Sequence, residues 1–182
     1  TTTRGCGLTM TQVIVRPMLR SDVDAVVGVA DLVAGVGYYT SAIIDAFLER
    51  STANGVVYSY VAVADVVVGF RFTFPPGSWH QGRGHGLTPG KWPAPIEACG
   101  YFQTCLVHPD WMGRGVGGQL AQCAIDDLRA SGALGLIAHS WKESPHNSSF
   151  RYMRKLGFVA VAEYPRYWSD VDYACVRCGN PC

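Results

Sequence analysis

The residues best suited to chemistry lie in one stretch, residues 104–120, which reads TCLVHPDWMGRGVGGQL. Four glycines fall within six residues of it. Glycines let a backbone turn sharply, and they let a phosphate approach main-chain N–H groups without meeting a Cβ atom. If a helix begins there, its first N–H groups have no partner inside the helix and carry partial positive charge. The stretch therefore predicts an anion site, with a pyrophosphate as the favoured ligand.

The elements on either side have to position this stretch. Residues Tyr101–Val107 are aromatic, apolar or β-branched, which favours a strand, and Pro109 cannot donate to a sheet ladder. Residues Gln119–Ala130 carry apolar side chains at helical spacing. In this strand, turn and helix, the N–H groups expected to face the anion are those of Gly113, Gly115, Val116, Gly117 and Gly118. A glycine-rich turn without a ligand is the alternative.

Two common phosphate-binding motifs do not fit. Gly113-x-Gly115-x-x-Gly118 has the spacing of a dinucleotide fingerprint, which needs the first strand–helix unit of a parallel sheet and an acidic residue about 20 positions on. The loop instead lies past the middle of the chain, and residues 131–142 contain no Asp or Glu. A nucleoside-triphosphate loop needs Gly-Lys followed by Ser or Thr, and the stretch has no such sequence.

The stretch resembles motif A of the GNAT superfamily of acyl-CoA N-acyltransferases. That motif reads Val-x-Pro and, a few residues later, Gln/Arg-x-x-Gly-x-Gly/Ala. Val107, Pro109, Gly115 and Gly117 fit it, whereas Met112 stands at the Gln/Arg position. The resemblance implies that coenzyme A supplies the pyrophosphate.

Lys155-Leu156-Gly157-Phe158 is similar to motif B of the same superfamily, which usually reads Lys-x-Gly-Phe. The two motifs occur in the family's order, and the resemblance covers about residues 11–174. It implies an N-acetyltransferase that moves an acetyl group from acetyl-CoA to a primary amine by direct attack in a ternary complex. A catalytically inactive acyl-CoA-binding or regulatory module is the alternative, because Met112 and Met153 stand at positions that the family uses.

The resemblance also implies a GNAT-like α+β fold, a mixed sheet of about six or seven strands flanked by four helices, with splayed central parallel strands. Ser21 is expected to cap the first helix. The long loop 75–96, which carries Trp79 and Trp92, is expected to cover the acceptor pocket or to be a surface insertion. Periodicity and turn residues predict strands over 11–18, 56–64, 66–74, 97–107, 134–140, 158–162 and 167–176, and helices over 21–34, 41–53, 119–130 and 145–156.

By resemblance, the pantetheine arm lies between the splayed strands and bonds to the main chain of the first. The segment Val36–Thr40, with Tyr38 and Tyr39, would border the acceptor site, unless these tyrosines are ordinary turn residues. The predicted coenzyme A contacts are Cys105, Leu106, Val107, Met112, Gly113, Arg114, Gly115, Val116, Gly117, Gly118 and Asn147.

Acyl transfer to an amine needs a group that takes a proton and a group that gives one to the departing thiolate. The family often places a tyrosine four residues before the glycine of motif B, where this chain has Met153. Tyr152, about 100° around the helix, is the acid candidate, and a packing role is its alternative. Residues Tyr101–Val107 contain no carboxylate, so the base candidates are Glu97 and His108 at the ends of that strand, with Ser140 and Glu143 further on.

The C-terminal residues 175–182 form a cysteine-rich tail. Cys175, Cys178 and Cys182 have the spacing of a zinc knuckle, but zinc prefers four ligands, so a fourth must come from elsewhere. An unmetallated tail is the alternative.

Length and composition predict one acyltransferase domain, residues 11–174, after a disordered lead or expression remnant over 1–10. The net charge of +1 gives no electrostatic case for nucleic acid or an anionic membrane. The chain has no run of 18 apolar residues and no signal-peptide pattern, so we expect it in the cytoplasm. A charged fraction of 16%, against a usual ~25%, suggests that a partner covers some surface, as in a homodimer.

Overall fold

A five-stranded mixed sheet forms the centre of the computed structural model, which describes residues 12–79, 90–92, 94–142, 144, 148–167, 169, 174 and 179. The strand order is β1-β4-β5-β6-β7, and the β6–β7 pair alone among these is parallel. The strands are β1 (Ile14–Pro17), β4 (Tyr60–Val63), β5 (Val67–Phe74), β6 (Cys99–Val107) and β7 (Gly135–Ala138).

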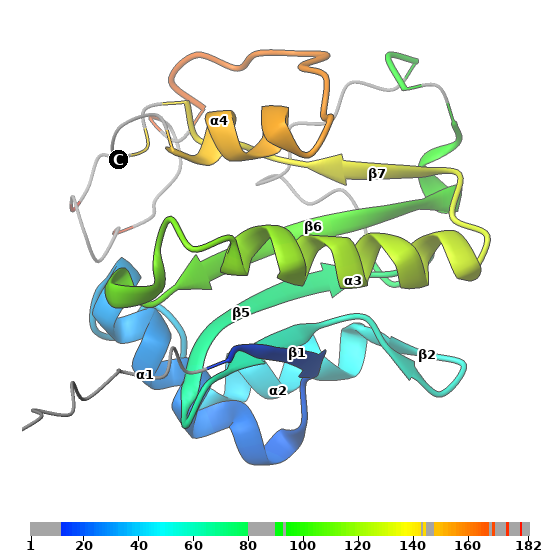
Figure 1. The fold of residues 1–182 in the computed structure, drawn as a ribbon. Coiled ribbons are helices and arrows are strands. Elements are labelled where there is room, and N and C mark those ends of the chain that lie inside the picture. Colours follow the sequence, from blue (N-terminus) through cyan, green and yellow to red (C-terminus); the bar gives the residue numbers. More distant parts are fainter. Residues whose placement is uncertain are drawn as a thin grey trace, which may run out of the picture.

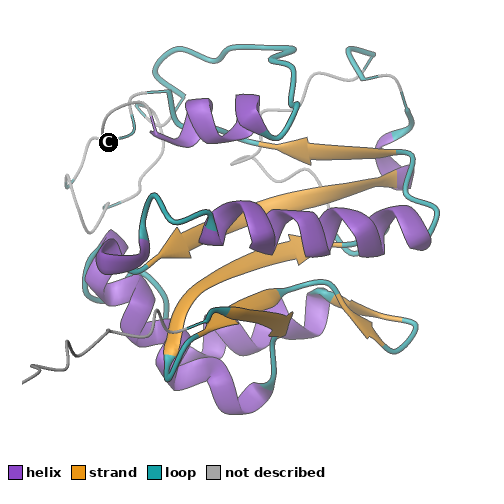
Figure 2. Ribbon diagram, viewed as in Figure 1, coloured by secondary structure: helices purple, strands orange, loops and turns teal. Residues whose placement is uncertain are grey.

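Helices cover both faces of this sheet (Figure 1, Figure 2). The helices α1 (Val23–Ala34) and α2 (Ser41–Arg50) pack on one face, where Phe70 and Phe72 of β5 are fully buried. The other face carries α3 (Val116–Ala130) and α4 (Ser148–Lys155). The expected α+β fold with a mixed sheet and four helices is confirmed. Within the described residues, no helix is long and apolar enough to cross a membrane.

The strand predicted over 56–64 divides into two parts. Tyr60–Val63 pairs with β5 as expected, through a turn in which the Ala64 N–H donates to the Val66 carbonyl. Val56–Val57 instead forms β3, which pairs with β2 (Thr52–Ala53) in a separate two-stranded sheet. Asn54 and Gly55, both at positive φ, make the turn between them, as an Asn-Gly pair favours.

The start of α1 differs from the expectation that Ser21 caps it. A 3₁₀ turn over Arg20–Asp22 precedes the helix, and the carboxylate of Asp22 accepts a hydrogen bond from the Leu19 N–H at 2.8 Å. Arg16 of β1 donates two hydrogen bonds to the same carboxylate, at 2.7 and 2.8 Å. Asp22 is buried. It therefore holds the turn before α1 and ties that turn to β1.

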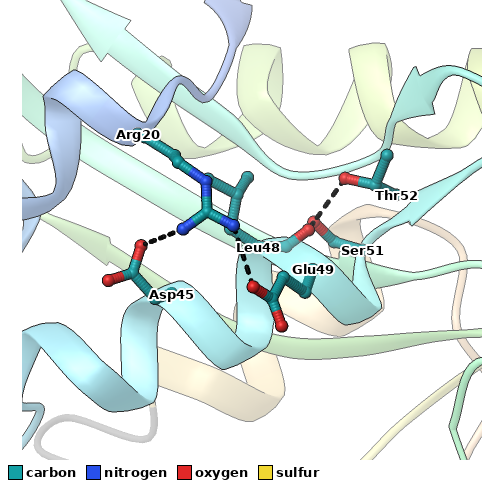
Figure 3. A network of polar contacts seen from close by, with 6 residues as sticks. All are labelled: Arg20, Asp45, Leu48, Glu49, Ser51 and Thr52. Atoms are coloured by element: carbon teal, nitrogen blue, oxygen red, sulfur yellow. Dashed lines mark hydrogen bonds and ion pairs between the residues drawn. The ribbon is translucent and has the colours of Figure 1, made fainter.

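Helix α2 is shorter than expected. The Thr40 hydroxyl caps it by accepting from the Ile43 N–H. The helix ends at Arg50 because the hydroxyls of Ser51 and Thr52 both donate to the Leu48 carbonyl, at 2.9 and 2.8 Å (Figure 3). On its exposed side, Arg20 bonds to Asp45 and Glu49 (Figure 3).

Strand β6 contains a β-bulge. Phe72 pairs with Thr104 but Thr73 pairs with Phe102, so Gln103 has no partner in β5. Beyond the bulge, Thr104 lies near α1 and α2, and before it Phe102 packs under α3. The bulge thus decides which side chains of the central strand face each pair of helices.

The C-terminal strand expected over 158–162 does not form. Gly157, at φ 87°, ends α4, and Phe158 packs on the core under α3 instead of pairing. Its expected partner over 167–176 lies largely outside the described residues. In the loop 75–96, Trp79 is a core residue. Its ring stacks on that of Tyr101, with 4.8 Å between the ring centroids, and its Nε1–H donates to the Cys99 carbonyl.

Candidate active site

The glycine-rich loop leads directly from β6 into α3. Pro109–Trp111 forms a 3₁₀ turn, and Gly113 and Gly115 adopt positive φ of 75° and 82°. Gly115 is the N-cap of α3, so the helix begins at Val116, three residues before the predicted start. Residues with a Cβ rarely adopt positive φ, so glycine is favoured at these two positions.

The first turn of α3 has open main-chain donors. In the described part of the chain, the N–H groups of Val116, Gly117 and Gly118 have no acceptor. A Cβ atom at Gly118 would meet nothing within 4 Å, which leaves room for a ligand to reach the backbone. At Gly117 a Cβ would lie 3.4 Å from the Tyr152 ring and 3.8 Å from the Cys105 thiol. The first turn of α3 thus combines open N–H donors with open space, and both are features that the predicted anion site requires.

Met112 and Arg114 lie on the outer part of the same loop. Met112 is 53% exposed. The Arg114 guanidinium lies 5.1 Å from the centre of the Trp111 ring. The loop thus offers one cation at its rim, close to the first turn of α3.

The central parallel strands splay apart. Their pairing begins at Cys99 with Gly135 and ends at Phe102 with Ala138, whereas β6 continues to Val107. Figure 1 shows the two strands separating towards their carboxyl ends. Residues 104–107 of β6 remain paired with β5 on their other edge. The expected splay is confirmed. Among the described residues, no strand pairs with the main chain of Cys105, Leu106 and Val107 on the β7 side.

Tyr152 points to the junction of β6 and α3. Its hydroxyl donates to the Gly117 carbonyl at 2.7 Å and lies 4.0 Å from the Cys105 sulfur. The one-residue offset from the family's usual position therefore does not turn the phenol away from the splay. Burial, followed by the nearby Cys105, raises the pKa of the Tyr152 phenol above its usual range, and Arg71 opposes that rise.

Arg71 of β5 is a residue that the sequence reasoning missed. It is 0% exposed and donates to the Tyr152 hydroxyl at 2.8 Å. Its guanidinium also lies 3.7 Å from the centre of the Phe102 ring. The signal was present in the sequence: one charged residue stands inside the otherwise apolar or uncharged run Val67–Phe74. Arginine is rarely fully buried in proteins, so a strand of this kind indicates a special role.

The opposite face of the splay carries a second set of polar side chains. The Tyr39 hydroxyl, from the α1–α2 connection, lies 2.6 Å from the Thr104 hydroxyl. The Tyr101 hydroxyl lies 2.9 Å from Nδ1 of His139, which follows the last paired residue of β7. Burial raises the pKa of Tyr39 and that of Tyr101 above the usual range of a phenol. Sequence reasoning singled out Tyr39 but missed His139.

The two base candidates from the sequence lie at opposite ends of β6. Glu97 is exposed in a 3₁₀ turn before the strand. His108 follows the strand, where its Nδ1 accepts from the Asp110 N–H at 3.2 Å and so caps the next turn. The nine-residue strand between them, at about 3.3 Å per residue, separates them by roughly 30 Å. The structure therefore does not bring Glu97 and His108 to one centre.

Some predicted site residues lie outside the described part. These are Asn147, Glu143 and the tail cysteines Cys175, Cys178 and Cys182. Among the residues that are described, no group of three or more His, Cys, Asp or Glu side chains is placed to hold a metal ion. The zinc prediction for the tail stays a prediction.

A glycine-rich helix start, a central strand splayed from its parallel neighbour and a tyrosine from the following helix together define an acyltransferase-like class of α+β fold. The chain belongs to the Acetyltransferase (GNAT) family, whose family model matches residues 45–158. A comparison with curated protein sequences gives no match.

Solved structures share the fold at low sequence identity. The aminoglycoside N-acetyltransferase AAC(6')-Iy, in complex with the bisubstrate analogue CoA-S-monomethyl-acetylneamine, is 19% identical, with a TM-score of 0.64 over 84% of this chain and 95% of that one. Ard1 from Thermoplasma volcanium is 20% identical, with a TM-score of 0.65 over 87% and 90%. The ribosomal-protein-S18-alanine N-acetyltransferase from Escherichia coli is 13% identical, with a TM-score of 0.62 over 88% and 86%.

Proposed function

We propose that this protein transfers an acetyl group from acetyl-CoA to a primary amine, by direct attack in a ternary complex. The observation that carries the proposal is the position of the Tyr152 hydroxyl, 2.7 Å from the Gly117 carbonyl at the start of α3. It lies beside the edge of β6 that has no partner strand in the described part of the chain. A thioester whose diphosphate binds the first turn of α3 and whose arm follows this edge has its sulfur close to that hydroxyl.

The proposed coenzyme A contacts follow the open main chain. The N–H groups of residues 113–118 take the diphosphate, since a helix start favours anions. The amide-bearing arm bonds to the main chain of Cys105, Leu106 and Val107, because a strand edge without a partner has free donors and acceptors. Arg114 supplies a charge at the rim.

The amine and the proton donor are proposed to lie on opposite faces of the splayed strands. The amine approaches from the face of Tyr39 and Thr104 and attacks the acetyl carbonyl, while Tyr152 on the opposite face gives its proton to the departing thiolate. His139 is the proposed acceptor of the amine proton, since imidazole titrates near neutral pH and this side chain lies where the strands separate. Glu97 and His108 lie at opposite ends of β6, so they do not act together in this step.

The test is thiol release from acetyl-CoA with a panel of amines, alongside calorimetric titration with coenzyme A. The panel contains the acceptor types of the structural neighbours, an aminoglycoside and a peptide that begins with alanine. We expect coenzyme A to bind and at least one amine to be acetylated. Binding without turnover across the panel would favour the inactive acyl-CoA-binding module, and the absence of binding would overturn both functions.

A further inference from the structure

Arg71 is a buried cation that has no matching anion among the described residues. The side chain is 0% exposed, and its Nε and Nη1 atoms have no hydrogen-bond partner within the described residues. No carboxylate in that part of the chain forms an ion pair with it. Burying an unpaired charge is costly, so a structural purpose alone gives a poor account of this residue.

Two groups compensate part of this charge. The Phe102 ring lies under the guanidinium at 3.7 Å, a cation–π contact that takes no hydrogen bond. The Tyr152 phenol oxygen accepts one hydrogen bond from Nη2 at 2.8 Å. Of these two groups, Tyr152 has a proton to lose, and its loss would create the missing negative charge.

We infer that Arg71 is a positioning residue, which holds the Tyr152 phenol and stabilises the phenolate that forms when Tyr152 acts as the acid. This inference rests on the proposed function. When the bond between the acetyl carbon and sulfur breaks, the thiolate takes the Tyr152 proton and leaves as a thiol. The phenolate pairs with the guanidinium, the attacking nitrogen gives its proton to a base or water, and Tyr152 regains a proton from solvent.

The arrangement also orients the proton. Because the phenol oxygen accepts from Arg71, its own O–H must point elsewhere, and it points to the Gly117 carbonyl in the first turn of α3. That is the end of the helix where the thioester carrier is proposed to lie. Burial works against ionisation of this phenol, and the guanidinium lowers the pKa again.

The first experiment needs no substrate. A fluorinated tyrosine that ionises near neutral pH replaces Tyr152, and its ionisation is followed by absorbance against pH. In the Arg71→Met protein we expect the midpoint to rise by about one to three pH units, because a nearby opposite charge has been removed. Arg71→Lys should give a smaller rise, since it keeps the charge but loses the guanidinium geometry.

Arg50→Met is the matched control. Arg50 also lies over an aromatic ring, at 4.5 Å from Phe74, but it comes from α2 on the other face of the sheet. Its removal should leave the midpoint at position 152 unchanged. An unchanged midpoint in both Arg71 variants would overturn the inference, and Arg71→Lys decides alone if Arg71→Met does not fold.

Turnover gives an independent readout. Arg71→Met should lower kcat with little change in the KM for acetyl-CoA, and it should have no further effect in a Tyr152→Phe background. A purely structural arginine would change stability, with equal kinetic effects in both backgrounds. Wild-type protein that turns over no amine would count against the proposed function, whereas the absorbance titration would still decide the role of Arg71.

Discussion

The Tyr39 hydroxyl and the Thr104 hydroxyl lie 2.6 Å apart, although 65 residues separate them in the chain. This bond ties the connection between α1 and α2 to the central strand, one residue after the bulge at Gln103. The Tyr39 ring also packs edge-on against the rings of Phe47 and Phe72, with 5.6 and 6.0 Å between the ring centroids. The wall of the proposed acceptor site is therefore held by both a hydrogen bond and aromatic packing.

Loss of this bond should affect the amine more than acetyl-CoA. Tyr39→Phe keeps the ring packing and removes the hydroxyl, so we expect a cost of about 0.5–1.5 kcal/mol in the free energy of unfolding. The KM for the amine should rise, with the KM for acetyl-CoA unchanged. Thr104→Val should act in the same way, and the double variant should lose less than the sum. Equal changes in both KM values would contradict this role.

Tyr152→Phe should reduce kcat by roughly 10²- to 10⁴-fold, the usual contribution of a positioned acid. Calorimetry should find the affinity for coenzyme A little changed, because the proposed contacts to the diphosphate come from the main chain. Met153→Leu, one position further along α4, is the control and should retain kcat. A Tyr152→Phe protein with wild-type kcat would assign this tyrosine to packing.

Gly118→Ala separates stability from ligand binding. Gly118 lies in the first turn of α3 with nothing within 4 Å of an added Cβ, so alanine should stabilise the helix by up to about 1 kcal/mol. The same methyl group would occupy the space proposed for the diphosphate and should weaken coenzyme A binding. Gly28→Ala in α1 is the matched control, with equal space and no proposed ligand. Unfolding curves and calorimetry measure both quantities, and equal affinities for the two variants would remove the diphosphate from this position.

His139 should set the acidic limb of the pH profile. A base must be deprotonated to accept the amine proton, so kcat/KM should rise with pH through the range where imidazole titrates. His139→Ala should lower kcat/KM and abolish that limb. Steady-state rates measured across pH provide the check, and a profile that keeps the limb in the variant would exclude this histidine as the base.

Asp22 should make stability sensitive to acid. The hydrogen bonds from Arg16 are the main reason why the pKa of this carboxyl lies below its usual range in the folded protein. A lowered pKa means that the carboxylate stabilises the fold above the unfolded value of about 3.9, and that this contribution is lost as pH falls through the folded pKa. Asp22→Asn should lower Tm at neutral pH and flatten its dependence on pH below about 5. Arg16→Met should flatten it as well.

Local sequence was sufficient for the glycine-rich start of α3 and for most elements. The glycines between Met112 and Gln119, Pro109 and the apolar periodicity of α3 all lie close together in the chain, and local preferences decide their structure. The helix C-terminus at Gly157 follows from the same kind of signal. The strand predicted over 158–162 was wrong: Phe158 packs on the core under α3, a contact that the β-branched residues of this run do not reveal.

The polar side chains of the site depend on long-range geometry. The direction of Tyr152 depends on how α4 lies against β6, and a difference of one residue is about 100° of rotation. The bond between Arg71 and Tyr152 joins residues 81 positions apart. His139 was missed because its position in the sequence shows only that it follows an apolar run. That this run ends where β6 and β7 separate is a property of the fold.

The bulge residue in β6 makes the site sensitive to a one-residue deletion. Side chains alternate across a strand, so one added residue reverses the facing of everything on one side of it. Gln103 is that residue, and for this reason the Phe102 ring reaches the Arg71 guanidinium while Tyr101 reaches His139. Deleting Gln103 would move Phe102 and Tyr101 to opposite faces of the sheet from those that they now occupy. Loss of this single residue would thus disturb the contacts of Arg71 and those of His139 together, although every strand and helix could still form.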